Sequence, residues 1–254
     1  MAMSEADLII SVGARFDDRV TGKLNTFGVN AKIAHIDIDP ASISKLIQVD
    51  YPIIGDVKSV VQDLLDTLKE TFHTGKFFAW NETIKAYNDK HPLRYKDSDD
   101  VLKPQWVIEE IGKRWGDDVM LSTDVGQHQM WSAQFYPFRH PNDWLSSSGL
   151  GTMGFGLPAA IGAKVANKDK ISVNVSGDGS ILMNIHEILT ASQYNIPVIN
   201  IILNNSYLGM VRQWQTLFYD SRFSQTNLEH QADFTKIAEG FGGIGYKEKT
   251  KQEF

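Results

Sequence analysis

Segments of two kinds follow one another along this chain, and their alternation is the feature that most limits how it can fold. Runs rich in β-branched residues at 118–126, 170–179 and 197–205 are typical of strands. Between them lie runs with apolar residues at helical spacing, such as 104–115 and 180–195. Strands that alternate with helices predict an α/β fold, with parallel sheets flanked by helices.

The first third shows the same alternation on a smaller scale. It is followed by a polar, proline-bounded stretch without periodicity, which is typical of a linker. The end of the chain, 242–254, looks like the start of one more strand, so we expect the chain to be part of a longer polypeptide. The expected elements are strands at 7–13 and 32–39, helices at 57–72 and 77–91, a first unit at 1–96, a linker at 97–103 and a second unit at 104–254.

Composition excludes several classes of partner and site. A net charge of −6 provides no field that would attract nucleic acid or an anionic membrane surface. The chain has no cysteine, which excludes disulfides, thiolate metal sites and a cysteine nucleophile, and fits a reducing compartment. We therefore expect a cytoplasmic protein, or an organellar one if its source is eukaryotic. No run approaches the roughly 18 apolar residues of a membrane span, so we expect no membrane partner.

Polar residues follow three of the expected strands, in the words TDVGQH, SGDGS and LNNSY. In parallel sheets, ligands bind at the carboxyl ends of the strands. Asp178 lies between glycines at one such end and Asn205 at the next, and their oxygens are the ligands that Mg²⁺ prefers. The alternative for Asp178 is an ordinary helix N-cap. The pair predicts a metal that clamps a phosphate group.

The run GLGTMGFGLPAA, residues 149–160, has the G-x-G-x-x-G spacing of dinucleotide sites. That fingerprint needs an apolar strand directly before it, and residues 140–148 are typical of a loop, although Asp169 lies at a suitable distance for a ribose contact. The glycines also suit two alternative roles: they could admit an anion to the start of a helix, or allow close helix packing.

Two further motifs are also common in ordinary structural segments. HEILT begins like the zinc-protease motif H-E-x-x-H but ends in Thr190, so it lacks the second histidine. The cluster RFDDR, Arg15 to Arg19, is either a solvated turn with weak surface ion pairs or part of a site. Neither motif alone predicts a function.

Taken together, these sequence motifs resemble those of a known family. GDG followed by NN resembles the thiamine diphosphate signature of the pyruvate-decarboxylase-like superfamily. DVGQHQMWSAQ, GDGSILMNIHEI and LNNSYLGMVRQWQ, within residues 119–214, resemble the catalytic subunits of acetohydroxyacid synthases, also called acetolactate synthases. ADLIISVGARFDDRVTG and HIDIDPASI resemble the second half of the same family's middle domain, which holds a non-redox FAD.

The resemblance implies a role for each matching residue. Asp178, Asn205 and the backbone carbonyl of Tyr207 would bind Mg²⁺. Met153 would lie beneath the bend of the cofactor, with its backbone oxygen near the pyrimidine amino group. Met210 and Trp214 would line the substrate channel, although such a pair at helical spacing is also typical of a core. Around thiamine diphosphate would lie Val125, Gly126, Gln127, His128, Gly151, Met153, Gly179, Ser180, Tyr207, Leu208, Gly209 and Met210, and around FAD would lie Gly13, Ala14, Arg15, Asp17, Arg19, Asp37, Gly55 and Asp56.

The resemblance also implies an activity and partners. The family decarboxylates pyruvate and joins the product to pyruvate or 2-ketobutyrate in branched-chain amino-acid biosynthesis. Its subunits form homodimers or homotetramers with shared active sites, and a small regulatory subunit is expected. The cofactor is activated by a glutamate from a domain that no segment here resembles, so we expect the isolated chain to be inactive. Two alternatives remain: another thiamine enzyme, such as an oxidase, glyoxylate carboligase or decarboxylase, and a non-catalytic cofactor-binding module.

Overall fold

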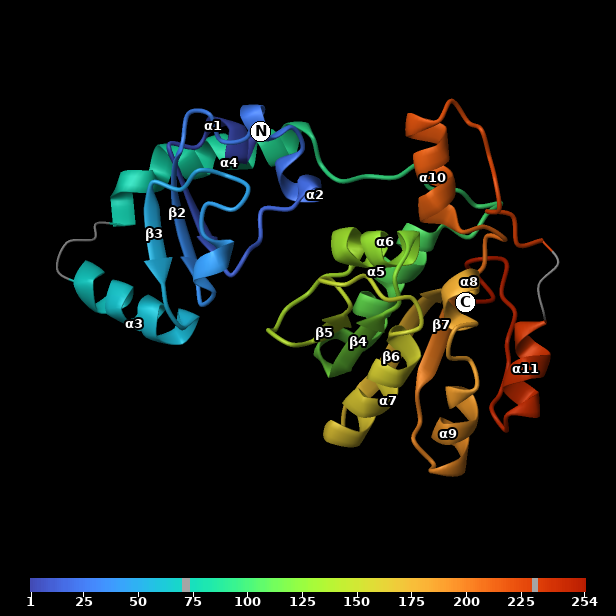
Figure 1. The fold of residues 1–254 in the computed structure, drawn as a ribbon. Helices are drawn as coiled ribbons and strands as arrows, with labels where there is room; N and C mark the ends of the chain where they lie inside the picture. The colour runs from blue at the N-terminus through green and yellow to red at the C-terminus, as the bar shows by residue number, and fades with distance from the viewer. Residues whose placement is uncertain (70–73, 230–232) are drawn as a thin grey trace. The chain divides into compact units, whose positions relative to one another are not determined.

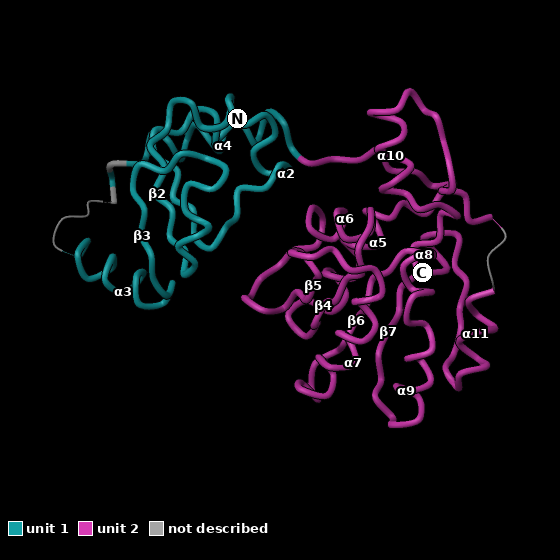
Figure 2. The backbone as a smooth tube through the Cα atoms, viewed as in Figure 1, with its two compact units in different colours: residues 1–92 teal, residues 93–254 magenta. Residues whose placement is uncertain are grey.

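The computed structural model describes residues 1–69, 74–229 and 233–254. The chain forms two compact units, Met1–Pro92 and Leu93–Phe254 (Figure 2). The division lies a few residues before the expected linker at 97–103. Within the described ranges, no helix is both long and apolar enough to cross a membrane.

Unit 1 is built on a three-stranded parallel sheet in the order β1-β2-β3 (Figure 1). Its middle strand is buried along most of its length, whereas β3 is exposed throughout. The expected strands and helices of this unit are confirmed, but β3 was not anticipated, and residues 70–72 of the expected helix 57–72 lie outside the described residues. The elements are α1 (Ala2–Glu5), β1 (Leu8–Val12), α2 (Asp18–Thr21), η1 (Leu24–Thr26), β2 (Lys32–Asp37), η2 (Pro40–Ser42), β3 (Tyr51–Ile54), α3 (Val57–Leu68), η3 (Thr74–Phe77) and α4 (Phe78–Lys90).

Unit 2 is built on a four-stranded parallel sheet in the order β5-β4-β6-β7. The three strands expected from the sequence are confirmed as β4, β6 and β7, and the α/β fold is confirmed with them. The edge strand β5 is an addition, because its segment was expected to be a loop. The strands are β4 (Val119–Thr123), β5 (Trp144–Ser146), β6 (Ile171–Gly177) and β7 (Ile199–Leu203).

Helices lie before, between and after the strands of unit 2. The single helix expected at 180–195 is wrong: the chain leaves the α-helix after Ile181, continues with bonds from residue i to i−3, and re-enters a helix at Glu187. The strand expected to start within 242–254 is also absent from the described residues. The helices are α5 (Pro104–Trp115), η4 (Gly116–Asp118), α6 (Gln127–Phe135), α7 (Gly156–Ala166), α8 (Asp178–Ile181), α9 (Glu187–Gln193), α10 (Gly209–Phe218) and α11 (Phe234–Gly240).

The two faces of the unit 2 sheet are buried in different ways. Leu121 and Val173 are register partners, fully buried, and belong to the apolar core that includes Ile108 and Ile111 of α5. On the opposite face, Ser122 donates to the Gly156 carbonyl at 2.9 Å, and Ser172 donates to the Ala160 carbonyl at 2.7 Å. One face therefore packs through an apolar cluster, whereas the other combines hydrogen bonds to α7 with the buried apolar residues of that helix, Leu157 and Ala160.

Candidate functional site

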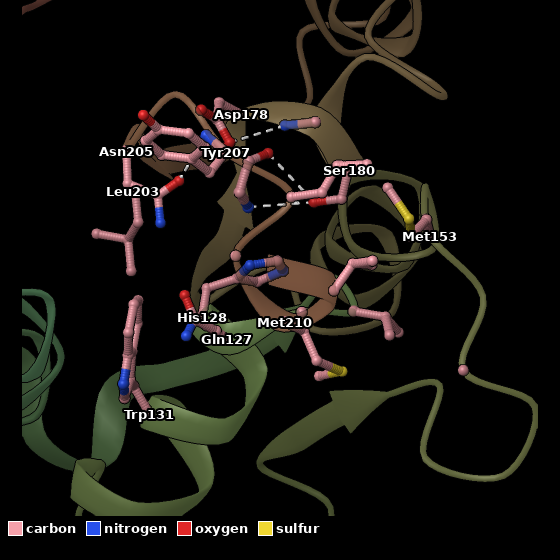
Figure 3. A pocket seen from close by; sticks show the side chains of 18 residues that line it. Gln127, His128, Trp131, Met153, Asp178, Ser180, Leu203, Asn205, Tyr207 and Met210 are labelled. Carbon is pink, nitrogen blue, oxygen red and sulfur yellow. Dashed lines mark hydrogen bonds between the residues drawn. The ribbon is translucent and has the colours of Figure 1, made fainter. Parts of the chain in front are cut away.

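Three neighbouring strands of unit 2 end at one pocket. β4 pairs with β6, and β6 pairs with β7, so the residues that follow them meet at the same edge of the sheet. The pocket has a volume of about 170 Å³ (Figure 3). Its lining consists of Val125, Gly126, Gln127, His128, Trp131, Gly151, Met153, Gly177, Asp178, Gly179, Ser180, Leu203, Asn205, Tyr207, Leu208, Gly209, Met210 and Val211.

The lining includes every residue that the resemblance assigned to thiamine diphosphate or Mg²⁺. Trp214 is not among the lining residues: it lies on α10, 44% exposed, with its ring 6.2 Å from that of Phe218. Trp131 and Val211 line the pocket without having been anticipated. Both belong to helices whose first turns contain expected residues, so helical spacing was the signal that would have identified them.

Asp178 is the first residue of α8 and is 1% exposed. The N-cap position belongs to Gly177, so the helix-cap alternative for Asp178 is wrong. One carboxylate oxygen of Asp178 accepts from the Gly179 N–H at 3.0 Å. Figure 3 shows this side chain on the same side of the pocket as Asn205 and Tyr207.

Asn205 lies in the loop after β7, and its side chain forms a hydrogen bond within that loop. Its side-chain oxygen accepts from the Tyr207 N–H at 3.0 Å, and Tyr207 in turn forms an isolated antiparallel bridge with Asn227. A carboxylate, a carboxamide oxygen and a backbone carbonyl are hard oxygen donors of the kind that Mg²⁺ prefers. The described residues contain no cluster of three acidic, histidine or cysteine ligands, so a metal here would take most of its ligands from neutral oxygens, water and a phosphate.

His128 is the second residue of α6 and is 5% exposed. Its Nε2 is buried and has no hydrogen-bond partner within the described part of the chain. A methyl group on Gly177 would lie 2.8 Å from Nδ1, so the ring needs a glycine there. Burial lowers the pKa of His128 to about 4, which keeps the imidazole neutral near pH 7. A buried, unpartnered ring nitrogen in a pocket wall suits a polar ligand.

Two longer helices begin at the pocket beside the short α8. Gln127 opens α6, and its side chain donates to Gln213 of α10 at 2.9 Å. Gly209 opens α10, and a side chain there would collide with Gln127 and lie 3.2 Å from the amide nitrogen of Asn205. The free N–H groups of helix starts favour anions. This end of the pocket therefore suits a phosphate group.

The glycine-rich run passes along another side of the pocket and ends in α7. Gly154 has φ +90°, and a methyl group on it would lie 2.7 Å from the Met183 Cβ. A methyl group on Gly149, by contrast, would meet no atom within 4 Å in the described structure. The short strand β5 does precede the run, but α7 begins only at Gly156, so the tight strand-to-helix turn of a dinucleotide site is not formed here.

The residues expected around FAD lie together at the corresponding edge of the unit 1 sheet. Gly13 follows β1, Asp37 ends β2, and Gly55 follows β3, with the Gly55 N–H donating to the Asp37 carbonyl at 3.0 Å. Asp56 caps α3 by accepting from the Lys58 and Ser59 N–H groups.

The RFDDR cluster lies after β1 in the same unit. Asp17 caps α2 and accepts from the Arg15 Nε at 3.0 Å, while Arg19 contacts Asp18 at 3.2 Å. The hydrogen bond from Arg15 lowers the pKa of Asp17. Each of these carboxylates already has a structural partner. Ala14 lies between Gly13 and Arg15 on the same loop.

Known proteins match this chain over both of its units. Residues 124–254 match the family described as thiamine pyrophosphate enzyme, C-terminal TPP binding domain, and residues 1–64 match its central domain. The acetolactate synthase large subunit of Haemophilus influenzae is 46% identical over 254 residues, which cover 99% of this chain and 44% of that protein. The acetolactate synthase isozyme 3 large subunit of Escherichia coli is 46% identical over 248 residues, covering 96% of this chain and 43% of that protein.

A third relative, the acetolactate synthase large subunit of Corynebacterium glutamicum, is 44% identical over 258 residues, covering 99% of this chain and 41% of that protein. The chain thus spans less than half the length of each of these relatives. The matched domain covers the whole pocket, from the end of β4 to α10. By this match the chain belongs to the thiamine pyrophosphate enzyme family.

Proposed function

We propose that this chain is the cofactor-binding part of an acetolactate synthase large subunit. It would take part in the decarboxylation of pyruvate and the joining of the product to pyruvate or 2-ketobutyrate. The observation that carries the proposal is the convergence of the expected thiamine diphosphate and Mg²⁺ residues on one pocket at the ends of β4, β6 and β7. The names of the relatives favour this synthase over the other thiamine enzymes considered.

In this proposal Asp178, Asn205 and the Tyr207 carbonyl hold Mg²⁺, whose charge neutralises the diphosphate. The helix starts at Gln127 and Gly209 supply N–H groups to the same phosphates. The thiamine ring of the cofactor, when bound, supplies the carbon nucleophile and the electron sink. Neutral His128 can donate one hydrogen bond to the ligand without adding a charge.

The remaining lining residues shape the apolar half of the pocket. Met153 is half-buried and lies along the glycine-rich run, where it would support the bend of the cofactor. Met210 lines the pocket one residue into α10 and would face the substrate. Trp214, one turn further along α10, would contact substrate only at the outer end of the channel.

The proposal extends to partners and to a second cofactor. We propose non-redox FAD at the strand ends of unit 1, homodimers or homotetramers with shared active sites, a small regulatory subunit, and a cytoplasmic location. The activating glutamate would come from outside this chain. For that reason the isolated chain is expected to bind thiamine diphosphate weakly and to make no acetolactate from pyruvate, which a colorimetric product assay would check.

The central test is thermal. Thiamine diphosphate with Mg²⁺ should raise the melting temperature of the protein, because a ligand at about 100 times its Kd stabilises the folded state by about 2.7 kcal/mol. Thiamine diphosphate with EDTA, and Mg²⁺ alone, are the controls. An equal melting temperature in all samples, together with no heat of binding by calorimetry, would contradict the proposed function.

A further inference from the structure

Asp124, which directly follows β4, is fully buried beside the pocket without lining it. Its Oδ1 accepts from two backbone N–H groups, that of Val125 at 2.9 Å and that of Gly154 at 2.7 Å. The second bond joins residues 30 positions apart and ties the end of β4 to the glycine-rich run. Its Oδ2 is also buried and has no hydrogen-bond partner in the described structure.

Gly154 is held from its other side as well. Its carbonyl accepts from the side-chain amide of Asn184 at 2.8 Å, in the segment between α8 and α9. Its φ of +90° and the 2.7 Å approach of the Met183 Cβ leave no room for a side chain. Both peptide groups of Gly154 are therefore fixed by hydrogen bonds to two different segments of the unit.

These bonds determine the orientation of Met153, a pocket-lining residue. The peptide bonds of the described residues are all trans, so the Met153 carbonyl points opposite to the Gly154 N–H, which is directed at Asp124. Rotation of the Met153–Gly154 peptide group would break the 2.7 Å hydrogen bond from Gly154 and leave the buried Oδ1 of Asp124 with one donor fewer. Asp124 thus fixes the direction of the Met153 carbonyl and the start of its side chain.

We infer that Asp124 is a positioning residue, which acts through the Met153–Gly154 peptide on the part of the cofactor that lies against Met153, and not on the diphosphate. This inference rests on the proposed function. The groups proposed to bind phosphate belong to other strand ends: Asp178 follows β6, and Asn205 and Gly209 come after β7.

Burial of the Asp124 carboxylate costs folding free energy. Burial raises the pKa of Asp124, since a charge in a low-dielectric interior is destabilised, while the N–H groups of Val125 and Gly154 oppose that shift. Burial of a carboxylate costs more free energy than burial of an apolar residue of similar volume. A need to orient the chain accounts for that cost.

The test compares the affinities of the full-length protein for two ligands, thiamine diphosphate and inorganic pyrophosphate, each with Mg²⁺. Asp124→Ala should weaken thiamine diphosphate binding about tenfold or more, as expected for the loss of a hydrogen bond to a charged group, and leave pyrophosphate binding within about threefold of wild type. Asp124→Asn keeps the Oδ1 acceptor and should restore thiamine diphosphate binding to within about threefold of wild type.

Pyrophosphate binding also reports whether Asp124→Ala folds. If it does not fold, Asn184→Ala removes the other hydrogen bond on Gly154 from a half-buried site, and should weaken thiamine diphosphate about threefold without affecting pyrophosphate. Equal loss of both ligands in a folded variant, or an unchanged ratio of the two affinities, would overturn the inference. Failure of the wild-type protein to bind either ligand would instead overturn the proposed function on which the inference rests.

Discussion

In both sheets of this protein, glycine and aspartate residues lie at the carboxyl ends of the strands, but their surroundings differ. In unit 1, Gly13 follows β1, Asp37 ends β2 and Asp56 lies two residues after β3. In unit 2, Asp124 and Asp178 directly follow β4 and β6. The carboxylates of unit 2 are 0% and 1% exposed, whereas Asp56 is exposed and Gly13 has open space around it. Acidic residues at strand ends are therefore not equivalent: those of unit 2 are buried where helices begin, and Asp56 of unit 1 is exposed.

The difference comes from the layers around each sheet. The strand β6 of the unit 2 sheet is buried from Ser172 to Gly177, and three helices begin at its end of the pocket. In unit 1 the outer strand β3 is exposed along its whole length. A pocket needs walls beside the strand ends, and in unit 2 the first turns of α6, α8 and α10 supply them.

The strongest test of this comparison is the pair Asp178→Ala and Asp56→Ala, each removing an acid directly after a strand-end glycine. Asp178→Ala should weaken Mg²⁺-dependent thiamine diphosphate binding about a thousandfold, because the diphosphate charge loses its anchored metal. Asp56→Ala should leave that affinity unchanged. Calorimetric titration of the full-length protein measures both, and equal affinities in wild type and Asp178→Ala would contradict the assignment of the unit 2 pocket as the cofactor site.

A pH titration tests the burial of His128 in the pocket wall of unit 2. Because the folded-state pKa of His128, about 4, lies below the unfolded value of 6.5, its contribution to stability is complete above pH 6.5 and is lost as the pH falls towards 4. The ligand-free protein should lose about 3 kcal/mol of unfolding free energy from this group, and His128→Gln should not. Urea unfolding at several pH values measures the difference, and parallel curves for the two proteins would contradict the assignment.

Two glycine substitutions separate backbone strain from crowding. Gly13, with φ +62°, has no atom within 4 Å of an added methyl group in the described structure, so Gly13→Ala should cost only about 1 kcal/mol of left-handed strain. Gly154→Ala adds a clash with Met183 to the same strain and should cost about 3 kcal/mol. Thermal unfolding would reveal the gap, and equal losses would mean that the unit 2 edge relaxes as freely as that of unit 1.

The smallest expected effect is the loss of stability when Asp56 of unit 1 no longer caps α3. Asp56 accepts from two N–H groups at the start of α3, so Asp56→Ala should lower the free energy of unfolding by about 1 kcal/mol. Asp56→Ser is the matched control, because serine also caps helices and should recover most of the loss. A loss that serine fails to recover would assign Asp56 a role other than capping.

The parts of the fold that the sequence predicted are those whose signal is local. β4, β6 and β7 are β-branched runs, and α5 has apolar residues at helical spacing, so their positions follow from pattern alone. β3 and β5 were missed because one contains Pro52 and is exposed, and the other has three residues at a sheet edge. Their pairing depends on neighbouring strands and not on their own composition.

The same limit applies to the site. Asp178 and Asn205 could be paired in advance, because adjacent parallel strands bring their ends together. The break after α8 could not be predicted: Asn184, within that break, bonds to Gly154, which lies 30 residues away in the sequence. The role of Asp124 depends on a contact of the same length, and nothing near it in the chain indicates that partner.

The hydrogen-bonded face between the unit 2 sheet and α7 has a consequence for mechanical precision. The hydrophobic effect has no direction of its own, whereas a hydroxyl bonded to one particular carbonyl fixes both a direction and a distance. Ser122 and Ser172 each hold one carbonyl of α7, so the helix has a single allowed offset along the sheet. The glycine-rich run leads into that fixed end, and Met153 thus takes its position in part from serines on the neighbouring strands.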